Sequence, residues 1–189
     1  MPDDGQVVSQ VLAGQTEAFE VIILKYQQPL FNYIGRMIAD RENALDLTQE
    51  VFLRAFSGLK TYDPQYNFRS WLFRIASHLV IDQWRKKKLP QTSLDQAYED
   101  DEGYLNSPSP ADTRALSVTA QYEIKELIRR VEEALEKISP ELREFFLWRY
   151  VNGLSYAEIA EVSGLPVGTV KNRVFQAKEK IRTCLEVKP

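Results

Sequence analysis

The chain has 189 residues, 44% of them hydrophobic, which is enough for one or two domains with a buried core. Long stretches of helix-forming residues, with only 8 Gly and 9 Pro, favour an all-α protein. One cysteine, Cys184, excludes an internal disulfide, and together with the single His78 it leaves too few ligands for an ordinary zinc site. No secretory signal or membrane-length apolar run is present in the sequence, so we expect a cytoplasmic protein without membrane insertion.

The formal net charge of −3 is distributed unevenly. Residues 91–113 contain six acidic side chains and no Lys or Arg, so the rest of the chain has a formal charge of +3. This segment shows no helical period and includes a Ser-Pro-Ser-Pro run ending at Pro110. The composition therefore predicts two small helical modules joined by a flexible acidic linker, with boundaries at residues 1–90, 91–118 and 119–189.

Apolar periodicity predicts four helices in the first module, at residues 5–12, 16–38, 41–56 and 68–88. We expect Pro29 to kink or divide the second of these, because proline removes a backbone donor. Asp40 is the expected N-cap of the third helix, and Pro90 stops the fourth after a basic end.

The second module is predicted to begin with a helix over residues 120–138. Ser139 and Pro140 then have the pattern of an N-cap followed by a first-turn proline, and the helix that they start ends near Gly153. Ser155 and Glu158 have the spacing of a capping box for the next helix.

Residues 155–181 have the form of a helix-turn-helix. Gly164 supplies the tight turn, and Val170, Val174, Ala177 and Ile181 form one apolar stripe on the second helix. The other face carries amides, cations and an aromatic ring, which suit the edges and phosphates of a DNA major groove. The alternative interpretation, a helical hairpin with a solvated polar face, requires the turn and stripe positions to agree by chance.

This helix-turn-helix, with its Gly168-to-Lys178 segment Gly-Thr-Val-Lys-Asn-Arg-Val-Phe-Gln-Ala-Lys, resembles the promoter-reading module of extracytoplasmic-function sigma factors. Residues 46–56, Asp-Leu-Thr-Gln-Glu-Val-Phe-Leu-Arg-Ala-Phe, resemble the polymerase-binding helix of the same family. Residues 68–76, Phe-Arg-Ser-Trp-Leu-Phe-Arg-Ile-Ala, resemble its promoter-melting helix. The resemblance implies a sigma factor that binds core RNA polymerase through the beta and beta-prime subunits and reads promoter DNA with both modules.

The family motifs also imply roles for particular residues. The expected polymerase contacts are Asp46, Gln49, Glu50, Phe52, Leu53 and Arg54. Contacts to the melted minus-ten element are expected from Phe68, Arg69, Trp71, Arg74, His78, Asp82, Trp84, Arg85 and Lys86, with Trp71 also a candidate for the core. Those to the duplex minus-thirty-five element are expected from Thr169, Lys171, Asn172, Arg173, Phe175, Gln176 and Lys178.

The resemblance further implies an anti-sigma factor as a partner, no cofactor, no metal, no small-molecule substrate and no catalytic site. At His78 this chain departs from the family, whose members often carry Asn there, and the change puts base preference at that position in doubt.

Two other classes of function compete with this reading. A conventional helix-turn-helix regulator would bind paired half-sites as a dimer, but it leaves the basic helix at residues 68–88 unexplained. A helical carboxylate metalloenzyme using Glu42, Asp46 and Glu50 would lack the usual Glu-x-x-His pairs, because Ile75 stands three residues before the only histidine. Without the resemblance, we would interpret those three acidic residues as a solvated helix face.

Overall fold

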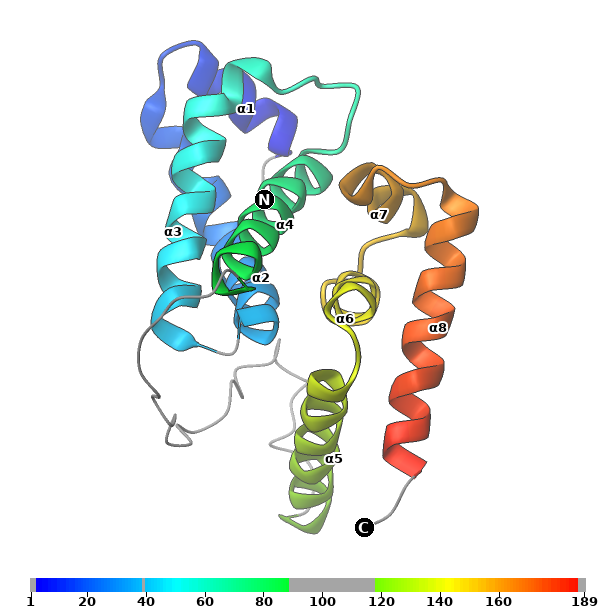
Figure 1. Cartoon of the computed structure of the whole chain (residues 1–189). Helices are drawn as coiled ribbons and strands as arrows, with labels where there is room; N and C mark the ends of the chain where they lie inside the picture. The colour runs from blue at the N-terminus through cyan, green and yellow to red at the C-terminus, as the bar shows by residue number, and fades with distance from the viewer. Residues whose placement is uncertain (1–2, 39, 89–117, 187–189) are drawn as a thin grey trace. The chain divides into compact units, whose positions relative to one another are not determined.

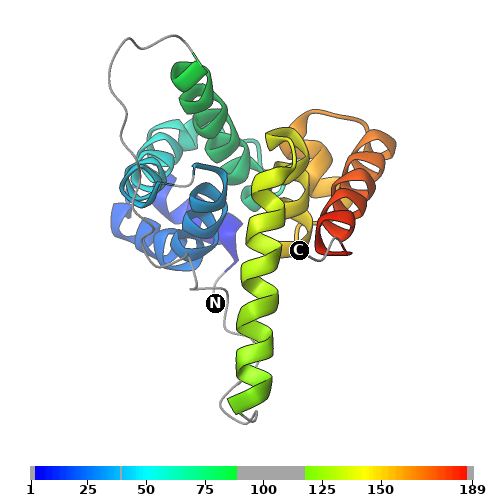
Figure 2. The ribbon, with the colours of Figure 1, turned by 60° about the horizontal axis from the view of Figure 1, so that its bottom comes forward.

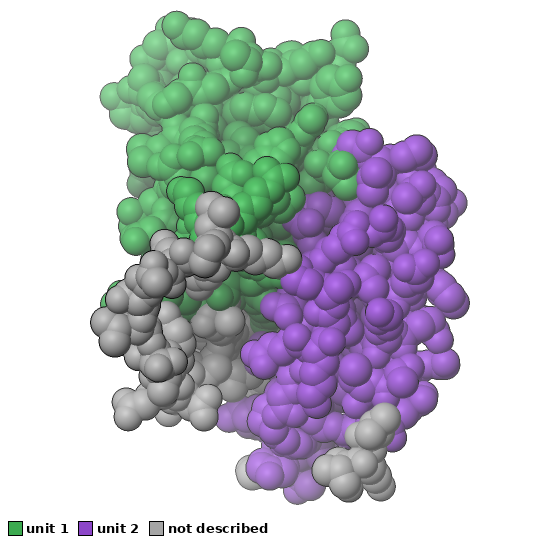
Figure 3. All heavy atoms as spheres, in the orientation of Figure 1, with its two compact units in different colours: residues 1–105, 161–163 green, residues 106–160, 164–189 purple. Residues whose placement is uncertain are grey.

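The computed structural model describes residues 3–38, 40–88 and 118–186. Every regular element in these ranges is helical (Figure 1). The chain divides into two compact units, residues 1–105 with 161–163 and residues 106–160 with 164–189 (Figure 3). The predicted acidic linker at 91–118 lies almost entirely outside the described residues.

The first unit contains α1 (Asp4–Leu12), α2 (Phe19–Ile38), α3 (Arg41–Gly58) and α4 (Phe68–Lys88), with short 3-10 turns at Thr16–Ala18 (η1) and Leu59–Thr61 (η2). Helix α2 packs against α1, α3 and α4, and α3 also packs against α4 (Figure 1). Each of the three long helices gives one apolar face to the shared core. Fully buried core residues include Ile22, Leu30, Tyr33, Ile34, Val51, Ala55, Leu72 and Phe73.

Helix α2 runs through Pro29 as one element, so the predicted division there is wrong. Proline removes one backbone donor, but buried side chains on both sides, such as Tyr26 and Tyr33, keep the helix packed. At the start of α3 the prediction is confirmed, because Asp40 accepts a hydrogen bond from the Asn43 backbone N–H at 3.1 Å.

The second unit contains α5 (Val118–Lys137), α6 (Pro140–Phe146), α8 (Val167–Glu186) and all of α7 (Tyr156–Ser163) except its last three residues. A π-helical segment, η4 (Leu147–Val151), continues α6. Helix α8 packs against both α5 and α6, and Figure 2 shows α5 as one uninterrupted helix. The core of the unit includes Leu147, Trp148, Leu154, Ile159 and the apolar stripe of α8.

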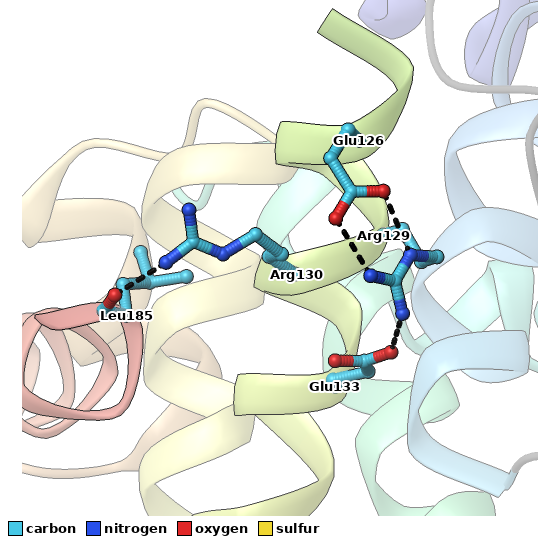
Figure 4. Close-up of polar contacts among 5 residues, drawn as sticks. All are labelled: Glu126, Arg129, Arg130, Glu133 and Leu185. Carbon is cyan, nitrogen blue, oxygen red and sulfur yellow. Dashed lines mark hydrogen bonds and ion pairs between the residues drawn. The ribbon is translucent and has the colours of Figure 1, made fainter. Parts of the chain in front are cut away.

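Two arginines tie the helices of the second unit to one another. Arg143 on α6 donates to the backbone oxygens of Leu135 and Glu136 at 2.8 and 3.0 Å, and so satisfies two carbonyls at the end of α5. Desolvation by burial lowers the pKa of Arg143, and the nearby Glu136 opposes that shift. Arg130 on α5 donates to the backbone oxygen of Leu185 on α8 (Figure 4).

A third arginine, Arg129, lies on the exposed side of α5 between two carboxylates of the same helix. It donates to Glu126 at 2.6 and 3.0 Å and also pairs with Glu133 (Figure 4). These pairs are three and four residues apart, the spacing at which side chains meet on a helix surface. They support α5 locally and connect it to no other helix.

Candidate nucleic-acid and polymerase interfaces

The helix-turn-helix predicted from residues 155–181 is formed by α7 and α8. The capping box is confirmed: the Ser155 N–H donates to Glu158 at 2.7 Å, and the Glu158 N–H donates to the Ser155 hydroxyl at 3.2 Å. Gly164 ends α7 with φ 68°, a left-handed conformation that glycine adopts without a steric cost. The turn therefore has a local, sequence-encoded geometry.

Helix α8 has a buried face and an exposed face, as the sequence predicts. Val170, Val174, Ala177 and Ile181 are at most 4% exposed. On the other side five of the predicted minus-thirty-five residues are exposed: Lys171, Asn172, Phe175, Gln176 and Lys178. The two remaining ones, Thr169 and Arg173, are half-buried at one border of that face.

The middle of the exposed face of α8 carries groups that can read a base edge. Phe175 is 61% exposed, an unusual exposure for a phenyl ring in a small protein. The Gln176 side-chain amide donates to the Asn172 amide oxygen at 3.4 Å, so the two amides lie next to each other. Amide side chains can pair with adenine, and an apolar ring can meet a thymine methyl group.

The borders of this face carry cations that neighbouring elements hold. The Lys171 ammonium lies 5.9 Å from the centre of the Tyr156 ring, on α7. Arg149, in η4, stacks on the same ring at 4.8 Å and donates to the Leu154 backbone oxygen at 2.9 Å. Arg173 forms an ion pair with Glu141 on α6. Sequence reasoning did not single out Arg149, Tyr156 or Glu141.

On α3 most of the predicted polymerase contacts share one exposed surface. Asp46, Gln49, Leu53 and Arg54 are exposed, and the half-exposed Glu50 accepts a hydrogen bond from Arg54 at 2.7 Å. Phe52 is only 8% exposed and lies at the edge of the core. We therefore leave Phe52 out of the proposed contact surface, because its ring contributes to packing.

Two apolar residues that the sequence analysis did not select extend this surface. Leu45 is 44% exposed and Phe56 43% exposed, and Leu53 between them reaches 64%. With Gln49 they recur at steps of three and four residues, so they share one side of α3. That spacing is visible in the sequence and is the signal that could have identified them.

On α4 the structure gathers five of the predicted minus-ten residues into one stripe. The exposed Arg74, His78, Asp82 and Arg85 and the half-buried Trp71 follow one another at steps of three and four residues. Arg74 and His78 have no polar contact with the other described residues, whereas Arg85 approaches Asp82 at 3.6 Å. Lys86 is exposed beyond the stripe, and Arg69 and Trp84 are half-buried on other sides of the helix.

Phe68 corrects the prediction for the start of α4. It was expected to receive an unstacked base, but its side chain is 3% exposed. Its ring packs against Tyr62 at 5.3 Å, Trp71 at 5.5 Å and Tyr26 at 6.2 Å. Phe68 is therefore a core residue that supports α4, and the exposed aromatic ring in this region is Tyr66, at 57%.

The turn before α4 is held in place by polar contacts. The Tyr62 hydroxyl donates to the Tyr66 backbone oxygen at 2.7 Å, and the Arg69 N–H donates to the Asn67 side chain at 2.9 Å. Burial raises the pKa of Tyr62, and the negative charge of Asp4 adds to the shift. Tyr62 therefore keeps its donating proton at neutral pH.

Comparison with known proteins gives a family match in each of the two helical units. Residues 22–89 match the family described as Sigma-70 region 2, and residues 128–181 match the family described as Sigma-70, region 4. The chain is 32% identical to the ECF RNA polymerase sigma factor SigW of Bacillus subtilis over 178 residues, 94% of each chain. It is 33% identical to the RNA polymerase sigma-H factor of Pseudomonas aeruginosa over 189 residues, 97% of this chain and 94% of the relative.

Two solved structures share the fold. CnrH, in complex with the cytosolic domain of CnrY, aligns with a TM-score of 0.70 at 22% identity over 98% of this chain and 99% of CnrH. The sigma factor RpoE of Bartonella quintana, in complex with the anti-sigma factor NepR, aligns with a TM-score of 0.66 at 20% identity over 90% of this chain and 98% of RpoE.

A helical region 2 followed by a helix-turn-helix region 4 defines a sigma-70-type factor, a protein that recognises promoters for RNA polymerase. Within that class, the chain belongs to the extracytoplasmic-function family of RNA polymerase sigma factors.

Proposed function

We propose that the chain binds core RNA polymerase and directs initiation at promoters by using three separate helix faces. The exposed face of α3 binds the polymerase, the stripe on α4 holds the melted minus-ten element, and the exposed face of α8 reads the minus-thirty-five element as duplex. The observation that carries the proposal is the face of α8, where exposed Asn172, Phe175 and Gln176 lie opposite a fully buried apolar stripe.

The chemistry of the α4 stripe supports its assignment to melted DNA. Strand opening requires cations for the phosphates and a surface that receives unstacked bases. Arg74 and Arg85 supply the cations, and the half-exposed Trp71 with the exposed Tyr66 supplies aromatic surface. His78 lies in the middle of the stripe, where it can stack on a base or donate a hydrogen bond.

The domain organisation follows from these roles. Residues 1–90 form the polymerase-binding and melting module, residues 91–118 the connector, and residues 119–189 the duplex-reading module. The protein acts in the cytoplasm, where its polymerase lies, and performs no catalysis itself.

An anti-sigma factor is the second proposed partner. One structure with this fold is a complex with the anti-sigma factor NepR, and another is a complex with the cytosolic domain of CnrY. The exposed apolar side chains of α3, Leu45, Leu53 and Phe56, offer an anti-sigma factor the surface that the polymerase also uses. Competition between an anti-sigma factor and core polymerase for the same chain is the expected behaviour.

The test is a pull-down and an in vitro transcription assay with purified bacterial core RNA polymerase and a library of promoter fragments. Stable binding with new, sequence-dependent initiation supports the proposal and identifies both promoter elements. Tight dimeric binding to a palindrome, without polymerase binding, would instead identify a conventional regulator.

The α3 surface is tested in the same assay with Leu53→Asp. A matched control is Leu24→Asp on α2, since Leu24 is 62% exposed and Leu53 is 64% exposed. Loss of polymerase binding in the Leu53 variant alone supports the surface, and equal binding by both variants removes it.

A further inference from the structure

Arg173 occupies a border position on the DNA-facing helix. It is half-buried, whereas Asn172 beside it in the sequence is exposed and Val174 on its other side is buried. A side chain between the buried and exposed faces of a groove-reading helix points toward a wall of the groove. Phosphates line those walls, and contacts to them position a protein without reading sequence.

Only one side of the Arg173 guanidinium is occupied. Its Nη1 pairs with Oε1 of Glu141, a residue in the first turn of α6. Within the described ranges, Nε and Nη2 of Arg173 have no hydrogen-bond or ion-pair partner. A guanidinium has five donors in a fixed plane, so a carboxylate on one edge leaves the other edge available for a phosphate.

The pair also joins two helices. Glu141 lies 32 positions before Arg173 in the chain, and the partners belong to α6 and α8, which pack together. The remaining pairs on α8, Arg182 with Glu179 and Glu186, are within one helix and only stabilise it locally. Among the described residues, the Glu141 pair is the ion pair that holds a cation of α8 from outside that helix.

We propose that Glu141 is a positioning residue for promoter binding: it holds the Arg173 guanidinium in the plane and direction in which its free edge binds a DNA phosphate. This inference rests on the proposed function, and it adds a residue that makes no contact with DNA itself. The side chains are 31% and 60% exposed, so the pair is partly screened by water. Exposed pairs of this kind are worth about a two- to fivefold change in binding.

The test measures binding of the reconstituted polymerase holoenzyme to a labelled duplex that carries the minus-thirty-five element and ends before the minus-ten element. Affinity is followed between about 50 and 200 mM salt, because each phosphate contact contributes about 0.9 to the slope of log K against log salt. Arg173→Ala is expected to lower that slope by about 0.9. Glu141→Gln is expected to weaken binding about two- to fivefold with the slope unchanged.

The double variant Glu141→Gln/Arg173→Ala should bind no more weakly than Arg173→Ala alone, because Glu141 acts through Arg173. Glu126→Gln is the matched control: it removes the same charge from another carboxylate that pairs with an arginine, on α5. This control corrects for the general effect of one fewer negative charge on DNA binding.

Two results would overturn the inference. Tighter binding by Glu141→Gln than by the Glu126→Gln control would mean that the carboxylate competes with DNA for Arg173. An unchanged slope for Arg173→Ala would mean that Arg173 touches no phosphate. The wild type distinguishes these results from a failure of the proposed function. In that case its holoenzyme would show no preference for this duplex over a scrambled one.

Discussion

The two helices proposed to face DNA, α4 and α8, differ in how their polar side chains are held. On α8 the cations at the borders contact neighbouring elements: Arg173 pairs with Glu141, and Lys171 lies over Tyr156. On α4, Arg74 and His78 have no polar contact with the other described residues. The difference matches the proposed ligands, because a duplex presents a fixed lattice of phosphates and a melted strand does not.

The support beneath the two helices differs as well. An aromatic cluster of Tyr26, Tyr62, Phe68 and Trp71 packs under the start of α4. In the second unit the buried face of α8 is aliphatic, and the buried aromatic pair is Phe145 and Trp148, whose rings lie 5.3 Å apart. Among the described residues, Arg74 and His78 on α4 have no polar contact, and they thus contrast with Arg173 and Lys171 on α8, which contact neighbouring elements. The following predictions test this contrast.

The largest expected effect comes from Trp148→Ala, which leaves a large cavity in the core of the second unit. We expect a loss of about 3–5 kcal/mol in the free energy of unfolding of that unit. The remaining tryptophans, Trp71 and Trp84, lie in the first unit, so their fluorescence reports that unit alone. Urea unfolding followed by this fluorescence should be unchanged, while the helical circular dichroism shows a second, earlier transition. A single transition that both methods report, and that the substitution shifts, would contradict this, because it would show that the two units unfold together.

Next in size is the effect of removing the base-reading amides of α8. Each bidentate contact to a base contributes about 1–3 kcal/mol of discrimination, so Asn172→Ala and Gln176→Ala should each lower it about five- to hundredfold. Competition between the selected minus-thirty-five duplex and point-mutated duplexes measures the change. Binding to core polymerase should stay at the wild-type level. Retained discrimination in both variants would remove α8 as the reading helix.

An effect of similar size is expected from Arg74→Ala on α4. A charge-assisted hydrogen bond contributes about 1.5–3 kcal/mol, which corresponds to a loss of about tenfold or more in open-complex formation. Permanganate reactivity of unpaired thymines at the promoter reports melting, and binding to the minus-thirty-five duplex serves as the control. If the duplex affinity falls and melting does not, α4 binds the duplex and α8 the melted strand, which is the reverse of the proposed assignment.

The smallest effect is expected at Arg129 on α5, which pairs with carboxylates of its own helix. Its hydrogen bond to Glu126 lowers the pKa of that carboxyl below the ordinary 4.5. The stabilisation is therefore present above about pH 4.5 and is lost as the pH falls through the lowered pKa. Glu126→Gln should be slightly less stable than the wild type at pH 7, and the difference should shrink in acid. Thermal unfolding of both proteins between neutral and acidic pH checks this, and a constant difference would contradict it.

Sequence patterns predicted the helix-turn-helix well because its determinants are local. The capping box, Gly164 and the apolar stripe of α8 each depend on residues within one or two turns of one another. The general position of α4 also follows from local periodicity. The predicted division at Pro29 was wrong, since the packing that keeps α2 continuous comes from other helices.

The errors at Phe52 and Phe68 have a different cause. An aromatic ring suits both a core and a base-stacking surface, and residue type alone does not say which neighbours surround it. The pairing of Glu141 with Arg173 was also beyond sequence reasoning, because the partners meet only when α6 packs on α8. Roles that depend on contacts between distant segments required the structure.

The π-helical segment η4 has a consequence for protein engineering. The Asn152 N–H donates to the Leu147 backbone oxygen at 2.9 Å, five residues back, so this turn holds one residue more than an α-helical turn. Such a turn can be shortened by deleting one residue and restoring the ordinary ladder. The wide turn accommodates the extra residue, so the chain that follows would then leave the helix in nearly the same direction. We therefore expect the second unit to tolerate a one-residue deletion here better than one inside α5 or α8, where each deletion rotates the following chain by about 100°.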